Sequence, residues 1–101
     1  MLFHQARNEL ELIDRHLLVL KIVIEQGPIG ILKLSEVTNM QAHKIRYSLR
    51  VLEQNGLIKA SPQGATAGGN VDSFLETASE RFEELKSLLD LIEKHGNEIV
   101  R

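Results

Sequence analysis

The chain has 101 residues, a net charge of −2 and no cysteine. A domain of this length buries only about 60 to 70 % of its unfolded surface, which leaves room for an oligomer. The lack of cysteine excludes disulfides, a thiol nucleophile and Cys-ligated metal sites. The first residues reach Arg and Glu too early for a secretory signal, and the longest apolar runs are too short to span a bilayer. We expect a cytoplasmic protein with no membrane association.

Charge is distributed unevenly along the chain. Residues 1–60 carry 8 Lys and Arg against 6 Asp and Glu, whereas residues 61–101 carry 4 against 8. Because Lys and Arg supply most of the non-specific affinity for nucleic acid, an anionic partner is expected to meet the first half.

The first predicted element is a long helix over residues 2–26. Apolar residues from Phe3 to Ile24 recur at alternating intervals of three and four, which is a heptad stripe. Gly27 and Pro28 end the pattern. At 1.5 Å per residue the helix is about 37 Å long, more than a compact core of this size needs.

Shorter elements follow. We predict a brief extended piece around Ile29, a short helix around Leu34, and a tight turn at Asn39, a residue type that tolerates the left-handed conformation. The next helix covers residues 41–55. Its apolar face consists of Ile45, Leu49 and Leu52. Two short helices joined by a tight turn form a helix-turn-helix.

The second half begins with a small hairpin. Leu57 to Ala60 is the first predicted strand, Ser61 to Gly64 the turn and Ala65 to Ala67 a weak return strand. Residues 61–70 contain no Lys or Arg, so contact between this hairpin and DNA stays open.

A second long helix is predicted from residue 70 to residue 95. Asn70 is a good N-cap, and Gly96 is expected to stop the helix. Its apolar residues again recur by four and three, which favours an outward-facing stripe.

The stretch LSEVTNMQAHKIRYSLRVLEQNGLI, residues 34–58, resembles the helix-turn-helix core of MarR-like and related small regulators. The ending Leu-Glu-x-x-Gly-Leu-Ile is the most specific part. The matching residues are Leu34, Ser35, Asn39, Met40, Ile45, Leu49, Leu52, Glu53, Gly56, Leu57 and Ile58. The long terminal helices are similar to those of small archaeal winged-helix proteins and regulators that dimerise through such helices.

This resemblance implies a mainly α fold with a small β-hairpin wing, namely a winged helix-turn-helix with long N- and C-terminal helices. It implies one domain over residues 1–101, with an N-terminal extension for dimerisation (1–15), a winged core (16–69) and a C-terminal dimerisation helix (70–96). The implied function is binding of double-stranded DNA by a homodimeric transcriptional regulator associated with the nucleoid.

Helical geometry selects the residues expected to touch DNA. With Ile45 pointing inward and about 100° per residue, Leu49 and Leu52 lie within about 40° of the inward direction. The opposite side, expected to face the major groove, carries His43, Tyr47, Arg50 and Gln54. Phosphate contacts are expected from Lys44, Arg46, Lys33 and Lys59. Residues 33–59 contain five Lys and Arg against two Glu, and both Glu residues are expected away from the groove face.

A dimer interface is expected along the two long helices, because each is longer than the roughly 20 Å that the helix-turn-helix can cover. Its predicted residues are Phe3, Leu10, Ile13, Leu75, Phe82, Leu85, Leu89 and Ile92. Whether these helices pair within or between subunits stays open. The alternative function is a winged-helix module that binds another protein through its acidic last helix and does not bind DNA.

Other chemistry has little support. The four histidines lack metal-site spacing, the glycines near residue 68 are not followed by Lys-Ser/Thr, and no serine lies in a nucleophile elbow. We expect no enzymatic activity, no metal and no cofactor, while a small-molecule effector stays open.

Overall fold

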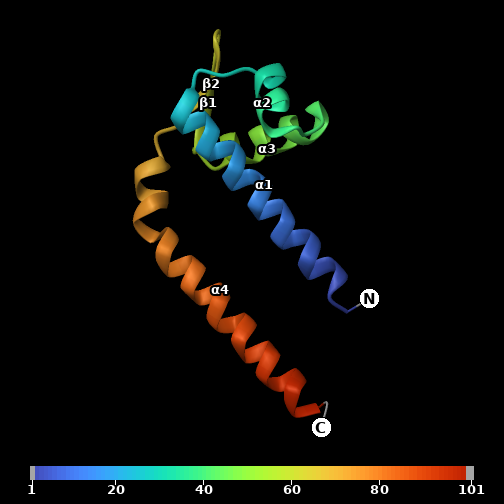
Figure 1. Ribbon diagram of the computed structural model, residues 1–101. Helices are drawn as coiled ribbons and strands as arrows, with labels where there is room; N and C mark the ends of the chain where they lie inside the picture. Colours follow the sequence, from blue (N-terminus) through green and yellow to red (C-terminus); the bar gives the residue numbers. More distant parts are fainter. Residues whose placement is uncertain (1, 100–101) are drawn as a thin grey trace. The chain divides into compact units, whose positions relative to one another are not determined.

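The computed structural model describes residues 2–99. As predicted, it is mainly helical with a small antiparallel hairpin (Figure 1). In chain order its elements are α1 (His4–Gln26), α2 (Ile31–Thr38), α3 (Ala42–Gln54), β1 (Ile58–Ser61), β2 (Gly64–Ala67) and α4 (Val71–Ile99). The chain divides into two compact units, residues 1–71 and 72–101. The expected 1–15 extension therefore belongs to the same unit as the helix-turn-helix.

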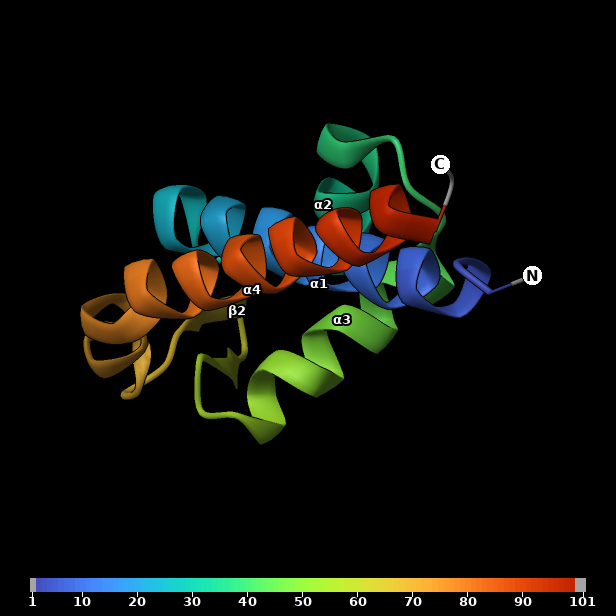
Figure 2. The same cartoon turned by 90° about the horizontal axis from the view of Figure 1, so that it is seen from below.

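Helix α1 provides the core of the first unit through its C-terminal half. The buried residues there are Val19, Leu20, Ile22 and Val23. Burying each such side chain contributes about 1.5–3 kcal/mol, and α1 packs against α2, α3 and β2 (Figure 2). The helix ends where expected, because Gly27 N–H donates to the Val23 carbonyl at 2.8 Å and Pro28 has no N–H to continue.

The turn between α2 and α3 is fixed by one left-handed residue. Asn39 has φ 57° and ψ 33°, as predicted for this position. Thr38 Oγ1 donates to the Leu34 carbonyl at 2.7 Å, and the Ser35 hydroxyl donates to the Met40 carbonyl. Both bonds hold hydroxyl groups near the end of α2 against backbone carbonyls. Helix α2 ends at Thr38, and α3 begins at Ala42, four residues later.

Helix α3 ends in a Schellman motif centred on Gly56, which has φ +70°. Gly56 N–H donates to the Glu53 carbonyl at 2.9 Å, and Leu57 N–H donates to the Leu52 carbonyl at 2.9 Å. Leu52 and Leu57 are both buried, which supplies the apolar contact that accompanies this motif. Gly56 thus turns the chain from α3 toward β1.

The hairpin follows directly. Its first strand begins one residue later than predicted, and its second strand begins one residue earlier than predicted. Residues 58–61 pair with residues 64–67, leaving Pro62 and Gln63 as the tip. Ile29 forms an isolated bridge with Ala65, whose N–H donates to the Ile29 carbonyl at 2.8 Å. The predicted extended piece around Ile29 is thus confirmed as a short edge beside β2.

The last helix runs further than predicted. Helix α4 continues through Gly96 to Ile99, so the expected stop at Gly96 is wrong. A glycine ends a helix when it adopts a left-handed conformation, and Gly96 has no positive φ. It therefore remains an ordinary helical residue, at a cost of roughly 0.5–1 kcal/mol relative to Ala. Among residues 2–99, no helix combines the length and apolar character needed to cross a membrane.

Candidate nucleic-acid interface

Helix α3 has a buried side and an exposed side. Ile45 and Leu52 are buried, as predicted, with 0 % and 3 % of their surfaces exposed. Leu49 is only half-buried, because it lines a groove between α3 and the hairpin. The buried side of α3 predicted from the spacing is therefore confirmed, and Leu49 lies at the edge of that side.

The exposed side carries the residues expected to face DNA. All six predicted α3 residues are exposed in the structure, namely His43, Lys44, Arg46, Tyr47, Arg50 and Gln54. Lys59 is exposed on β1, where it pairs with Thr66 of β2. Lys33 lies on α2, and its Nζ is 3.7 Å from Glu36 Oε1.

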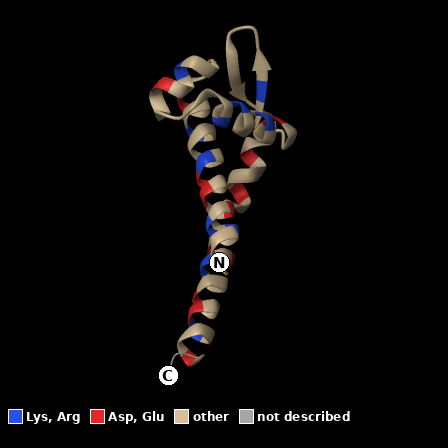
Figure 3. Cartoon of the chain, turned by 90° about the vertical axis from the view of Figure 1, so that its right-hand side faces the viewer, with Lys and Arg blue, Asp and Glu red and all other residues tan. Residues whose placement is uncertain are grey.

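The cations of α3 have no anionic partner within the part of the chain that the structure describes. No ion pair there involves Lys44, Arg46, Arg50 or Lys59, although four pairs form at other positions. Figure 3 shows these basic segments along α3 and on the hairpin. An unpaired surface cation is available to an external anion without first breaking an internal ion pair.

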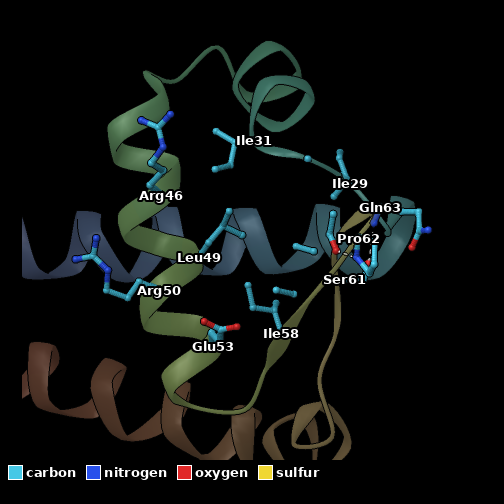
Figure 4. A pocket seen from close by; sticks show the side chains of 14 residues that line it. Ile29, Ile31, Arg46, Leu49, Arg50, Glu53, Ile58, Ser61, Pro62 and Gln63 are labelled. Carbon is cyan, nitrogen blue, oxygen red and sulfur yellow. Dashed lines mark hydrogen bonds between the residues drawn. The ribbon is translucent and has the colours of Figure 1, made fainter.

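The groove between α3 and the hairpin has a volume of about 570 Å³. Ile31, Leu49 and Ile58 lie along it, and Pro62 and Gln63 stand across from α3 (Figure 4). Arg46 and Arg50 line the same groove from successive turns of α3. The groove thus combines an apolar floor with a cationic wall.

Glu53 lines this groove as well, although it lies outside the face of α3 that is expected to meet the major groove. The reason is helical geometry, because residue 53 lies about 80° from the Ile45 direction, beside Arg46 at about 100°. Glu36 lies on α2 and pairs with Lys33. One carboxylate therefore shares the groove with two guanidinium groups.

On its opposite flank α3 contacts α1. The Tyr47 ring lies 5.8 Å from the His16 ring, measured between centroids. The Arg15 guanidinium carbon lies 5.9 Å from the Tyr47 ring centroid. Tyr47 retains 42 % exposure, so it combines packing on α1 with an accessible edge.

Ser48 connects these two helices from a fully buried position, with 0 % of its surface exposed. Arg15 Nε donates to Ser48 Oγ at 3.1 Å, and His16 Nδ1 lies 2.8 Å from the same oxygen. With Oγ accepting from Arg15, the Ser48 hydroxyl is free to donate to a neutral His16. Burial, reinforced by the charge of Arg15, lowers the pKa of His16 below its ordinary value, which favours this neutral form.

Arg15, His16 and Ser48 were missing from the predicted site. The burial of Ser48 could have been predicted from the sequence, because Ser48 lies about 60° from the Ile45 direction. A polar side chain at such a position needs a hydrogen-bond partner. Arg15 and His16 had no such signal in the sequence, because the face of α1 that meets α3 depends on how the helices pack.

The N-terminus of α3 has no side-chain cap. Gln41 occupies the cap position and makes no capping hydrogen bond through its side chain, as its residue type predicts. Across residues 2–99, no group of three His, Asp or Glu side chains is arranged to hold a metal ion.

The residues predicted for a dimer interface lie on two helices. Phe3, Leu10 and Ile13 are on or next to α1, and the α4 members are Leu75, Phe82, Leu85, Leu89 and Ile92. All eight are exposed, from 41 % for Leu85 to 67 % for Phe3. Each of the two helices thus carries a row of exposed apolar residues.

No protein-family model matches this chain, and a search of curated proteins found no match either. The proposed function therefore depends on the geometry of the site.

Proposed function

We propose that the chain is a winged helix-turn-helix protein that binds duplex DNA as a homodimer and regulates transcription. The observation that carries the proposal is the exposed side of α3, where Lys44, Arg46 and Arg50 have no ion-pair partner among the described residues. On α4, by contrast, Arg81 and Lys86 form ion pairs with neighbouring Glu residues.

The dimensions of α3 suit the major groove. Its 13 residues span about 20 Å, and the major groove of B-DNA, about 12 Å wide, admits an α-helix. In this arrangement His43, Arg50 and Gln54 face the base edges. Arg and Gln are the side chains that bind guanine and adenine edges in a bidentate manner, so these two are the candidates for sequence reading.

Phosphates are the second target. Arg46 lies on the hairpin side of α3, where it reaches one sugar-phosphate strand while α3 occupies the groove. The hairpin follows α3 as the wing, and its tip residues Pro62 and Gln63 supply no positive charge. Affinity is therefore expected to come mainly from α3, with Lys59 as the basic residue of the hairpin.

Homodimerisation would place two copies of α3 on one duplex. The exposed stripe of α4, together with Phe3, Leu10 and Ile13, offers the apolar surface for this contact. A two-fold symmetric dimer matches half-sites about 34 Å apart, or a multiple of that distance. Light scattering coupled to size-exclusion chromatography is expected to give twice the monomer mass of 11.4 kDa.

One observation favours the alternative function, a module that binds another protein. The groove beside α3 has an apolar floor and contains Glu53, a combination that also suits a peptide with an aliphatic side chain and mixed charge. A single protein recovered stoichiometrically, with no DNA binding at low salt, would support this alternative.

The test of DNA binding compares two charge-matched double variants. Replacing Arg46 and Arg50 with Gln is expected to weaken binding to a duplex, measured by fluorescence anisotropy at low salt, by at least tenfold. The control replaces Arg81 and Lys86 of α4, which form ion pairs with neighbouring Glu residues. The control has the same net charge, so equal losses in both variants would show a general charge effect and contradict the assignment to α3.

A further inference from the structure

Arg15 lies on α1, outside the helix-turn-helix and the hairpin, yet its side chain reaches α3. Its Nε donates to Ser48 Oγ at 3.1 Å, and its guanidinium carbon lies 5.9 Å from the Tyr47 ring centroid. Ser48 is fully buried, so the point that holds Nε is part of the rigid core. A long, flexible side chain is thereby fixed at its far end.

The remaining N–H groups of Arg15 are available to a ligand. The N–H of Nε is used in the bond to Ser48, and the two terminal nitrogens of the guanidinium group carry its other N–H donors. No ion pair involving Arg15 forms within residues 2–99, and the nearby Glu11 is engaged by Arg7 at 2.7 Å. The hollow lined by Arg15 also contains Glu11, Asp14 and Lys44, so two cations and two carboxylates lie at this edge of α3, and one of the carboxylates, Glu11, is already paired with Arg7.

The position of these two cations relative to α3 is informative. Around the helix, Arg46 and Arg50 lie about 100° and 140° from the Ile45 direction, whereas Tyr47 and Lys44 lie at about 200° and 260°. Arg15 joins α3 on the Tyr47 side, away from the hairpin. The two flanks of the exposed face therefore each carry cations.

A helix in the major groove has one sugar-phosphate strand on either side. We propose that Arg15 binds a DNA phosphate across the major groove from the strand contacted by Arg46, an inference that rests on the proposed DNA binding. Ser48 is the positioning residue, because it holds Nε and so limits the directions in which the two terminal nitrogens can lie. Guanidinium groups held in this way suit phosphate, since their fork matches two phosphate oxygens.

The test is the salt dependence of duplex affinity for variants at residue 15. Each phosphate contact contributes about 0.9 to the slope of log affinity against log salt. Arg15→Gln is expected to reduce the slope by about 0.9 per protomer. Lys21→Gln is the control, because Lys21 is an exposed cation of the same helix on a different face, and its slope is expected to equal that of the wild type.

Arg15→Lys separates phosphate binding from a merely structural role. Lysine keeps the charge but loses the Nε bond to Ser48, so the proposal predicts a wild-type slope with weaker affinity. Two results would overturn the inference while DNA binding stands. In the first, the slope falls equally in Arg15→Lys and Arg15→Gln. In the second, the wild type is salt-dependent and Arg15→Gln keeps the full slope. A wild type with salt-independent or no binding overturns both proposals.

Discussion

Removing the Ser48 hydroxyl is the sharpest test of how α1 and α3 are held together. Ser48→Ala deletes the oxygen that accepts from Arg15 Nε and lies 2.8 Å from His16 Nδ1. Leaving buried polar groups unsatisfied costs about 1–3 kcal/mol. The higher helix propensity of Ala offsets roughly 0.5 kcal/mol of this. We expect the free energy of unfolding to fall by about 0.5–2.5 kcal/mol in urea titrations followed by circular dichroism.

A double-mutant cycle removes the propensity contribution, because that contribution is the same in both backgrounds. Combining Ser48→Ala with His16→Leu is expected to give a coupling free energy of about 0.5–1.5 kcal/mol. Lys21→Ala replaces His16→Leu in the control cycle, where the coupling is expected to stay below about 0.5 kcal/mol. Equal coupling in both cycles would refute the assigned hydrogen bond between Ser48 and His16.

Three further predictions concern stability. Ile45→Ala opens a cavity at a site with 0 % exposure and is expected to lower the free energy of unfolding in urea by about 2–5 kcal/mol. Leu32→Ala is the control, because Leu32 is 82 % exposed, and it is expected to change that free energy by less than about 0.5 kcal/mol. Gly96→Ala is expected to stabilise α4 by about 0.5–1 kcal/mol, because nothing lies within 4 Å of the added Cβ; a lower helix melting temperature would instead indicate a helix that ends there. Burial and the charge of Arg15 lower the pKa of His16 in the folded protein from its ordinary value of 6.5. Just below pH 6.5 the unfolded chain therefore binds more protons than the folded protein does. The free energy of unfolding should decline as the pH falls from about 6.5. His16→Gln should remove that part of the decline in thermal melts, and an unchanged pH profile would contradict it.

Local chemistry explains which features the sequence predicts well. The turns at Asn39 and Gly56 follow from residues that tolerate positive φ, and the buried face of α3 follows from the spacing of Ile45 and Leu52. Each of these signals lies within a few residues of the feature that it determines. The end of α4 was predicted wrongly because Gly96 is compatible with both a helix and a stop.

Features that need two distant segments were beyond sequence reasoning. The hydrogen bonds from α1 to Ser48 join residues 32 and 33 positions apart, and the place of Glu53 in the groove depends on where the hairpin packs. Tyr47 was expected to face DNA from its angle alone, whereas the structure adds its contact with Arg15 and His16. Angles around a helix give a direction, but the neighbour found there depends on tertiary packing.

The salt dependence of wild-type binding to a duplex tests the central claim most directly. With Lys44, Arg46 and Lys59 from each protomer on phosphates, a dimer neutralises about six phosphates, and log affinity should fall against log salt with a slope near −5, or steeper where Arg15 binds a phosphate as well. A slope close to zero would contradict an electrostatic DNA interface on α3.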